Sequence, residues 1–354
     1  MSFSKLIKQK NILLIPFSWM YKAGAFIYHG LYDLKILKSE KPTVTTICVG
    51  NLSVGGTGKS PMVEYLIQLL KDAFKTAVVS RGYRRKTKGF LIANEDSTAN
   101  DIGDEPQQFH VKFPNVTIAV GEQRATAIQQ LMYVHPETEL VILDDAFQHR
   151  AIEAGLNILL TEYGNRFTKD WYLPAGSLRD LKKNYKRADV IVITKCPESI
   201  SEVVRQDILK ELRPTTTQTI FFTCIQYGQA YDIFTRKEER LDLLDSMVLV
   251  TGIANPAPLL EYLKPLKANL QHIGFADHYD FSETDIKGIL EKLAVTKGAQ
   301  KKIVTTEKDA MRLRQWPQMQ LQPVLAIPIQ HRFLFGEAKA FNEMVKKYVL
   351  QSSR

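Results

Sequence analysis

Cysteine is scarce in this sequence, and neither internal repeats nor low-complexity tracts occur. Three cysteines are present among 354 residues, namely Cys48, Cys196 and Cys224, and no two of them show CxxC spacing. A zinc site and a disulfide framework are therefore not predicted. Each cysteine lies in or beside an apolar run, so we expect buried thiols of a reduced, cytosolic protein.

Long hydrophobic runs are also missing, even from the most apolar tract of the chain, residues 1–37. Its charge-free runs, residues 11–21 and 23–32, are separated by Lys22 and fall short of the roughly 20 residues that a spanning helix needs. No A-x-A-like cleavage site follows. We therefore predict neither a transmembrane segment nor an exported protein.

The same tract has an amphipathic pattern. Met20, Ile27, Leu31 and Leu34 recur at helical spacing after Pro16. Aromatic rings and positive charges accompany them: Trp19, Tyr21, Tyr28 and Tyr32, with Lys5, Lys8, Lys10, Lys22, Lys35 and Lys38. This combination predicts that residues 1–40 form a membrane-associating helix region that lies in the interface. A terminal helix docked on its own domain is an equally open alternative.

Acidic residues are outnumbered by basic ones. The 47 Lys and Arg residues against 38 Asp and Glu residues give a formal charge of +9. A positive excess favours acidic partners such as nucleotides, phospholipids or nucleic acid. No zinc-finger spacing, RNA-binding aromatic motif or basic helix followed by heptads occurs, so we predict no nucleic-acid partner.

Short β-branched runs alternate with loops and helical stretches along the chain. They occupy residues 44–49, 77–80, 116–120, 140–143, 156–160 and 190–194, and then 247–251, 272–275 and 303–306. The alternation predicts an α/β fold of the P-loop NTPase type, in which a mostly parallel sheet is sandwiched by helices and a second, smaller α/β domain follows.

Two further apolar segments, residues 220–227 and 323–329, border the second domain and are predicted to pair as a two-stranded hinge. A helix predicted over residues 336–350 is assigned back to the first domain. The predicted organisation is thus the helix region 1–40, a first domain at 41–219 and 332–354, a hinge at 220–227 and 322–331, and a smaller domain at 228–321.

A glycine-rich loop stands between the first predicted strand and a helical pattern. It comprises Ser53, Val54, Gly55, Gly56, Thr57, Gly58, Lys59 and Ser60. Strand, loop and helix follow the order of a phosphate-binding P-loop, although Ser53 stands where the first glycine of the motif is expected. We predict that loop N–H groups bind phosphate, that Lys59 reaches the β and γ phosphates, and that Ser60 ligates Mg²⁺. A merely structural glycine loop is the alternative.

A later predicted strand, ELVILDD, ends in the carboxylates of Asp144 and Asp145. Such a pair downstream of a P-loop predicts a Walker B metal partner, with capping of the next turn as the alternative. Guanine-specific relatives carry an Asp two residues after a Thr/Asn-Lys pair, but here Thr194-Lys195 is followed by Cys196-Pro197. ATP is therefore predicted in preference to GTP.

Polar loops follow most of the predicted strands, and ligands of doubly wound sheets bind at that edge. Eight motifs occur in order between residues 49 and 313: VGNLSVGGTGKSP, SRGYRRK, GDEP, DDAFQHR, LPAGSLRD, TGIANP, FADHYDF and TTEKDAMRL. In this order they resemble the tetraacyldisaccharide 4′-kinases of lipid A biosynthesis. The resemblance implies an ATP-dependent, Mg²⁺-requiring kinase that phosphorylates the 4′-hydroxyl of a tetraacylated disaccharide 1-phosphate. It also implies a peripheral position at the cytoplasmic face of the inner membrane.

The resemblance further implies roles for single residues. Asp104 would accept the proton of the attacking hydroxyl, His278 would support it, and Lys59 would stabilise the transferred phosphoryl group. The implied metal ligands are Ser60, Asp144, Asp145 and Asp180, the last at a position where some relatives are expected to carry Glu. Asn255 would face the nucleotide. The implied contacts to the saccharide and its phosphate are Arg81, Tyr83, Gln148, His149 and Arg179.

The alternative from a different class is a P-loop switch or assembly ATPase without a small-molecule acceptor. Such a protein would not need the aromatic, basic amino-terminal tract or a carboxylate and a histidine drawn from separate lobes. Without the resemblance, Asp104 would be read as a loop carboxylate and His278 as a turn residue. The oligomeric state is not predicted.

Overall fold

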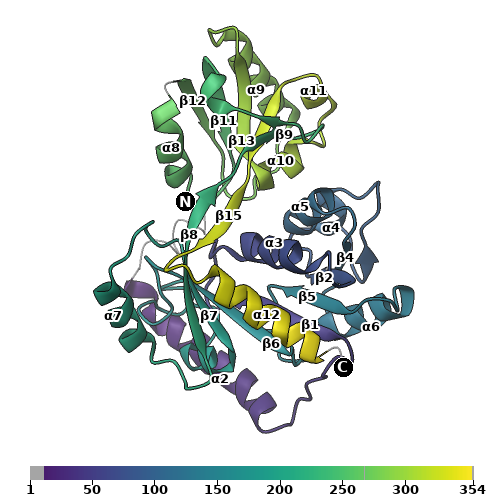
Figure 1. The fold of residues 1–354 in the computed structure, drawn as a ribbon, viewed down its shortest axis with the longest axis vertical. Coiled ribbons are helices and arrows are strands. Elements are labelled where there is room, and N and C mark those ends of the chain that lie inside the picture. Colours follow the sequence, from purple (N-terminus) through teal and green to yellow (C-terminus); the bar gives the residue numbers. More distant parts are fainter. Residues whose placement is uncertain (1–11, 267, 353–354) are drawn as a thin grey trace.

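The structure, a computed structural model, describes residues 12–266 and 268–352 and arranges them around two sheets (Figure 1). The larger sheet has the strand order β15-β8-β7-β6-β1-β5-β2-β4-β3, and the smaller has the order β10-β9-β14-β13-β11-β12. The predicted positive charges of Lys5, Lys8 and Lys10 lie outside the described residues.

Most neighbouring strands of the larger sheet are parallel, while β3 and β15 pair antiparallel at its two edges. Its strands are β1 (Thr45–Asn51), β2 (Thr76–Ser80), β3 (Leu91–Ile92), β4 (Thr117–Val120), β5 (Leu140–Asp144), β6 (Leu156–Glu162), β7 (Val190–Thr194), β8 (Thr219–Tyr227) and β15 (Ile329–Phe333). Those of the smaller sheet are β9 (Ala230–Asp232), β10 (Glu238–Glu239), β11 (Ser246–Thr251), β12 (Asn269–Gly274), β13 (Lys301–Thr306) and β14 (Val324–Ile327). The predicted fold class is confirmed.

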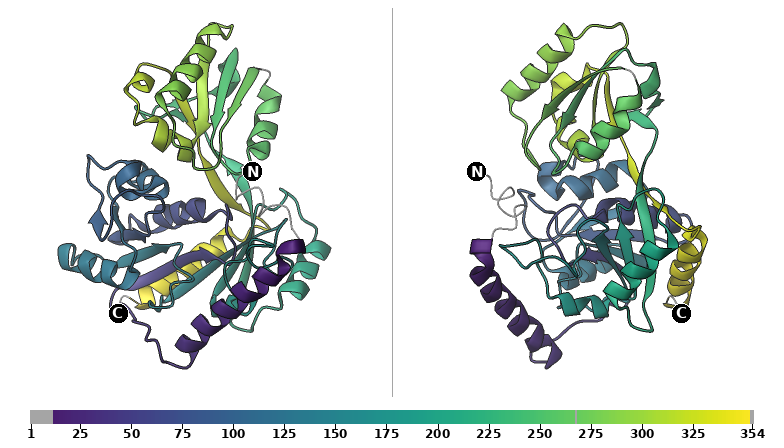
Figure 2. Two further views of the ribbon diagram at one scale, coloured as in Figure 1. Left: turned by 180° about the vertical axis from the view of Figure 1, so that it is seen from behind. Right: turned by 90° about the vertical axis from the view of Figure 1, so that its left-hand side faces the viewer.

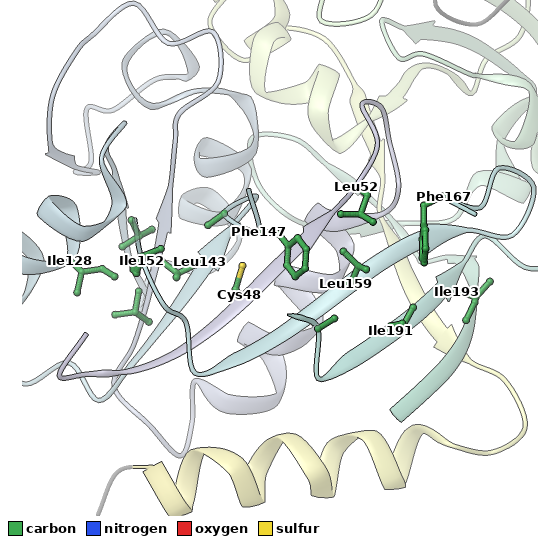
Figure 3. Close-up of a cluster of buried hydrophobic side chains, with 14 of the residues drawn as sticks. Cys48, Leu52, Ile128, Leu143, Phe147, Ile152, Leu159, Phe167, Ile191 and Ile193 are labelled. Carbon is green, nitrogen blue, oxygen red and sulfur yellow. The ribbon is translucent and has the colours of Figure 1, made fainter. Parts of the chain in front are cut away.

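Helices cover both faces of the larger sheet because its central strands bury both rows of side chains. In β1, Cys48 joins one apolar cluster, whereas Ile47 and Val49 join the other, as the two-residue period of a strand requires. The first cluster (Figure 3) takes in α6 (Arg124–Val134) and α7 (Glu202–Leu212), and the second takes in α3 (Lys59–Leu70), α5 (Asp104–Lys112) and α12 (Ala338–Ser352). All three cysteines are buried free thiols, as predicted.

The smaller sheet is also covered on both faces. Its apolar clusters take in α9 (Glu283–Val295) and α10 (Glu307–Leu313) on one side and α8 (Ala257–Leu263) on the other. Apart from α2 (Ile15–Asp33), which is described below, the remaining helices are α4 (Ala99–Ile102), α11 (Pro317–Gln320) and the 3₁₀ turns Ile12–Leu14, Lys182–Arg187, Leu241–Leu243 and Lys264–Leu266. The larger sheet with its helices is called the large lobe below, and the smaller sheet with its helices the small lobe.

The connection between the lobes corrects one predicted boundary. β8 and β15 pair antiparallel, with Tyr227 opposite Ile329, and they lead from the large lobe into the small lobe (Figure 1). The segment predicted as the second hinge strand, residues 323–329, lies mostly in β14, which pairs with β13 inside the smaller sheet. Pro328 separates β14 from β15. The prediction was wrong here because a short apolar run does not reveal which strand it will pair with.

Helix α2 (Ile15–Asp33) lies along the outside of the large lobe, on the opposite side of the molecule from α12 (Figure 2). Its buried residues are Ser18 and His29, whereas Met20 and Ile27 are 72% and 62% exposed. The helix therefore docks through polar side chains and turns apolar ones outward, the reverse of an ordinary surface helix. Within residues 12–266 and 268–352, none of the helices combines the length and hydropathy that a membrane crossing requires.

Candidate active site

The glycine loop lies at the carboxyl end of β1 and runs directly into α3, which begins at Lys59. Gly55 and Gly58 have φ angles of +111° and +89°, a region that residues with a Cβ rarely adopt. A Cβ on Gly58 would also approach the ring of His331 to 3.0 Å. The tip of the loop, residues 54–56, is exposed. Backbone N–H groups at the start of a helix, in a loop of this shape, form an anion-binding arrangement.

Two side chains that the sequence did not assign to this loop donate hydrogen bonds to its carbonyl groups. Thr194 Oγ1 donates to the Thr57 carbonyl over 2.8 Å, and His331 Nε2 donates to the Gly58 carbonyl over 2.8 Å. His331 Nδ1 accepts from Thr223 Oγ1 over 2.9 Å, which requires a neutral ring. Burial accordingly lowers the pKa of His331 to about 4. The end of β7 was a predictable neighbour of the loop, but a histidine 273 residues beyond Gly58 gives no local signal.

Lys59 lies beside the carboxylates at the end of β5. Its Nζ is 3.7 Å from Asp145 Oδ1 and donates to Asn51 Oδ1 over 3.4 Å. Burial lowers the pKa of Lys59. Arg179 binds Asp145 through two nitrogens, with 3.0 Å between Nη1 and Oδ2. The structure thus brings together Lys59, Asp145 and Arg179, three of the residues predicted for the site.

Asp144 is buried at the end of β5, where Ser80 Oγ donates to its Oδ2 over 2.9 Å. Burial raises the pKa of Asp144 to about 6, and the charges of Asp145 and Glu105 add to this effect. With the buried hydroxyl of Ser60 at the start of α3, the predicted metal donors here are all oxygen atoms. Mg²⁺ prefers such donors, and it takes one or two carboxylates together with phosphate oxygens and water. The residues present therefore fit Mg²⁺. In the described part of the chain, no group of three or more His, Cys, Asp and Glu side chains gathers around a metal position.

Asp180 has a different environment from the predicted metal contact. Its side chain is 0% exposed, and Oδ1 lies 2.7 Å from His29 Nε2 of α2. Asn184 Nδ2 and the Leu181 backbone N–H donate to the same oxygen over 2.5 and 2.7 Å, and Gln148 Nε2 donates to Oδ2 over 3.2 Å. Both oxygens accept hydrogen bonds, so Asp180 is a buried hydrogen-bond acceptor in this structure, and its contact with a metal ion stays a prediction.

Asp104 and His278 come from different lobes and are in contact. His278 Nδ1 lies 2.9 Å from Asp104 Oδ2, and Arg312 Nε of α10 approaches the same oxygen to 3.3 Å. Asp104 is the first residue of α5. His278 follows β12, where its backbone N–H donates to the Gly252 carbonyl over 3.0 Å and its own carbonyl accepts from Arg84 Nη1 over 2.6 Å. The two residues predicted to act together therefore meet at the junction of the lobes.

The start of α5 is also joined to the small lobe next to Asp104. Lys308 of α10 pairs with Glu105, the residue after Asp104, over 2.5 Å. Besides burial, the charge of Lys308 is one of the effects that lower the pKa of Lys59. A cavity of about 410 Å³ opens at the lobe junction, lined in part by Tyr83, Asp104 and His278. Asp104 and His278 therefore both line an open space at the junction of the lobes.

Three of the predicted saccharide contacts have defined neighbours in the structure. Gln148 donates to the Asn51 carbonyl over 2.7 Å, close to Lys59. The exposed ring of Tyr83 packs edge-on against His278, with 5.7 Å between ring centres. Burial lowers the pKa of His149, and the charges of Arg124 and Arg81 lower it further. The charges of Arg81 and Arg124 therefore lie close enough to His149 to favour its neutral form.

Two outcomes could not be anticipated from the motifs. Arg124, the buried first residue of α6, was not singled out, although it follows a predicted strand end as Gly121-Glu122-Gln123-Arg124. Asn255 lies in an exposed loop of the small lobe, where its Oδ1 accepts from the Ala257 backbone N–H over 3.2 Å. That contact is local and does not join Asn255 to the phosphate loop.

The fold and site together define a P-loop phosphoryl-transfer protein with two lobes. The family model for tetraacyldisaccharide-1-P 4′-kinase matches residues 10–350, and the chain belongs to this family. The chain is similar to a tetraacyldisaccharide 4′-kinase of Bacteroides thetaiotaomicron, at 42% identity over 356 residues, covering 96% of this chain and 94% of that protein. A tetraacyldisaccharide 4′-kinase of Flavobacterium johnsoniae is 39% identical over 344 residues, covering 96% and 97%.

A solved structure agrees with these relatives. The crystal structure of LpxK from Aquifex aeolicus in complex with ATP matches with a TM-score of 0.75 at 30% identity, and the match covers 95% of this chain and 98% of that chain. The resemblance drawn from the eight motifs is therefore confirmed over nearly the whole length of the protein.

Proposed function

We propose that this protein is an ATP-dependent tetraacyldisaccharide 4′-kinase that uses Mg²⁺. It transfers the γ-phosphoryl group of ATP to the 4′-hydroxyl of a tetraacyldisaccharide 1-phosphate, a lipid A precursor. Family membership over residues 10–350 and the activity named for the relatives support this reaction. The observation that carries the proposal is the 2.9 Å contact between Asp104 and His278 at the lobe junction, because a hydroxyl acceptor needs a positioned proton acceptor there.

The chemical step forms a bond between the 4′-oxygen and the γ-phosphorus and breaks the bond to the β–γ bridging oxygen, which leaves with ADP. The hydroxyl proton passes to Asp104. His278 and Arg312 both contact Oδ2 of Asp104, so we assign Oδ1 to the acceptor hydroxyl. These two neighbours hold the carboxylate in one orientation, with its other oxygen free for the acceptor hydroxyl.

Positive charge around the phosphates stabilises the transition state and binds the substrates. Lys59 and the loop N–H groups stabilise the charge that spreads over the transferred phosphoryl group. Bound Mg²⁺ would neutralise part of the triphosphate charge, and Ser60, Asp144 and Asp145 are the residues that would hold it. We assign the saccharide and its phosphate to Arg81, Tyr83, Gln148, His149 and Arg179, since an arginine fork can bind a phosphate through two charge-assisted hydrogen bonds.

We further propose that α2 rests on the cytoplasmic face of the inner membrane, where the acylated acceptor is anchored. The support is the outward apolar face of α2, on which Phe17, Trp19, Met20, Phe26 and Ile27 are each more than half exposed. A helix with such a face, flanked by lysines, suits the interface between headgroups and acyl chains.

Product detection tests the reaction directly. We expect purified protein, ATP and tetraacyldisaccharide 1-phosphate in detergent micelles to yield a lipid that carries one additional phosphoryl group, with one ADP released for each product. Mass spectrometry of the extracted lipid gives the readout. An acceptor whose 4′-position is already phosphorylated should not react. Hydrolysis of ATP with the lipid left unmodified would instead identify a switch ATPase.

Vesicle sedimentation tests the membrane proposal. Replacing Met20 and Ile27 together by serine should weaken binding to anionic phospholipid vesicles by about thirtyfold, because each side chain contributes roughly 1 kcal/mol of apolar transfer when partly buried in the interface. Val203→Ser is the matched control, since Val203 is an equally exposed apolar residue, at 71%, on α7. Equal vesicle binding by the double variant and by the control would contradict the proposed orientation of α2.

A further inference from the structure

Helix α2 is attached to the large lobe in an unusual way. The two residues that it buries, Ser18 and His29, are both polar, and their separation of eleven residues puts them on one face of the helix. Ser18 Oγ donates to the Tyr172 carbonyl over 2.9 Å and accepts from the Ala175 backbone N–H over 3.0 Å. Burying polar groups stabilises a docked helix only when each one finds a partner. The position of α2 is therefore specified by particular hydrogen bonds.

His29 makes the most deeply buried of these contacts. Its side chain is 3% exposed, and Nε2 lies 2.7 Å from Oδ1 of the fully buried Asp180. On the other side of the ring, Nδ1 lies 3.4 Å from Arg150 Nη1. Because an arginine nitrogen can only donate, the ring accepts through Nδ1 and donates to Asp180 through Nε2. The contact is a directed hydrogen bond from the membrane-side helix to the large lobe.

Asp180 is in turn hydrogen-bonded to a residue that contacts the strand before the phosphate loop. Its second oxygen, Oδ2, accepts from Gln148 Nε2 over 3.2 Å. The same nitrogen of Gln148 donates to the Asn51 carbonyl over 2.7 Å. Asn51 is fully buried at the last position of β1. A continuous series of hydrogen bonds therefore joins α2 to the strand end from which the phosphate loop begins.

Asn51 itself contacts the residues that face the phosphates. Its Nδ2 donates to Thr57 Oγ1 within the loop over 2.8 Å. Its Oδ1 accepts from Lys59 Nζ over 3.4 Å and from Arg179 Nη2 over 2.6 Å. A second connection runs in parallel, since Tyr21 of α2 donates to the Arg179 carbonyl over 2.9 Å. A shift of Asp180 would therefore displace Lys59 and Arg179, the two cationic side chains beside the triphosphate.

We propose that His29 is a positioning residue of the phosphate site: through Asp180, Gln148 and Asn51 it sets the placement of Thr57 and Lys59. Helix α2 is then a structural part of the ATP site as well as the segment that faces the membrane. The inference rests on the proposed function only in taking the loop as the ATP site. In a packed interior a displacement of about 1 Å at a phosphoryl-transfer site costs up to a hundredfold in rate.

Two substitutions of His29 by amide side chains of different length distinguish this positioning role from a role in packing alone. In His29→Gln the amide nitrogen occupies nearly the place of Nε2 and can still donate to Asp180, whereas in His29→Asn the shorter arm cannot reach it. We expect His29→Asn to lower kcat/KM for ATP by about tenfold, and His29→Gln to stay within about threefold of the wild type. Asp33→Asn is the control, because Asp33 also joins α2 to the lobe but through a half-exposed ion pair with Arg150.

Three measurements complete the test on the full-length protein in detergent micelles. The ATP dissociation constant, measured without lipid acceptor, should rise in His29→Asn, so the inference is tested even if the wild type phosphorylates no lipid. Vesicle binding should be unchanged, since His29 lies on the face turned away from solvent. The melting temperature shows whether the variants are folded. If His29→Asn and His29→Gln have the same ATP affinity and the same kcat/KM, the inference is overturned.

Discussion

Replacing Lys59 by alanine should lower kcat for lipid phosphorylation by about a hundred- to a thousandfold. The ammonium group lies at the start of α3, 3.7 Å from Asp145 and in contact with Asn51. Removal of one preorganised charge from a phosphoryl-transfer site costs about 3 to 4 kcal/mol of transition-state stabilisation. The measurement is steady-state formation of the phosphorylated lipid at saturating ATP.

The control for this prediction lies at the other end of the same helix. Lys71 follows α3 and pairs with its exposed neighbour Asp72 over 2.8 Å, so Lys71→Ala removes the same charge without touching the loop. It should retain wild-type turnover, and both variants should keep the melting temperature of the parent within a few degrees. Wild-type kcat in Lys59→Ala would show that the glycine loop does not hold the transferred phosphate.

Replacing Asp104 by asparagine should lower kcat by about a hundredfold or more while the affinity for ATP changes less than about threefold. The amide keeps the shape of the side chain but cannot accept the hydroxyl proton as the new bond forms. It also changes the contact with His278, which lies 2.9 Å from Oδ2. The measurement is single-turnover transfer from bound ATP, together with ATP binding in the absence of acceptor.

Two comparisons sharpen the interpretation of Asp104→Asn. Asp96→Asn, in the exposed loop before α4, is the control for loss of one carboxylate charge and should behave as the wild type. A double-mutant cycle with His278→Ala should be strongly non-additive, because removing either member of a unit removes most of its effect. Weakened ATP binding with unchanged transfer would assign Asp104 to nucleotide binding, and full additivity would show that the two residues act separately.

We propose that the lobe junction restrains ATP hydrolysis. Asp104 belongs to the large lobe, while His278 and Arg312 belong to the small lobe. Lys112 adds a bridge between Glu64 of α3 and Glu307 of α10, with distances of 2.6 and 2.8 Å. A proton acceptor that is oriented from both sides is complete only while these contacts are made. Opening of the lobes would therefore separate the acceptor from its supports and slow transfer to water.

Much of this site could be predicted because its signals are local or nearly so. The glycines, Lys59 and Ser60 stand next to one another in the chain, and their chemistry follows from the strand before them and the helix after them. Asp144 and Asp145 end a strand that pairs in parallel with β1, and parallel strands bring their carboxyl ends to one edge of the sheet. The Asp104 and His278 assignments came from the resemblance alone, since 174 residues separate them.

The sequence left open which partner a strand or a carboxylate finds in the folded chain. Residues 323–329 were rightly expected to be extended, but β14 pairs with β13 and only β15 continues the connection with β8. Asp180 was predicted as a metal ligand, and in the structure its Oδ1 lies 2.7 Å from Nε2 of His29 in the amino-terminal helix. A carboxylate binds a metal ion or a hydrogen-bond donor equally well, so its sequence position cannot distinguish the two.

By itself, the sequence determined the two α/β lobes, the phosphate loop with its acidic strand end, and the family, because these depend on periodicity, glycine spacing and contiguous motifs that short stretches of chain carry complete. Only the tertiary structure decided that α2 turns its apolar side outward, that His29 contacts Asp180, and that His331 contacts Gly58. Each of these contacts joins segments more than a hundred residues apart. Packing of the whole chain selects such pairs, because a buried polar group is stable only beside the one partner that the fold brings to it.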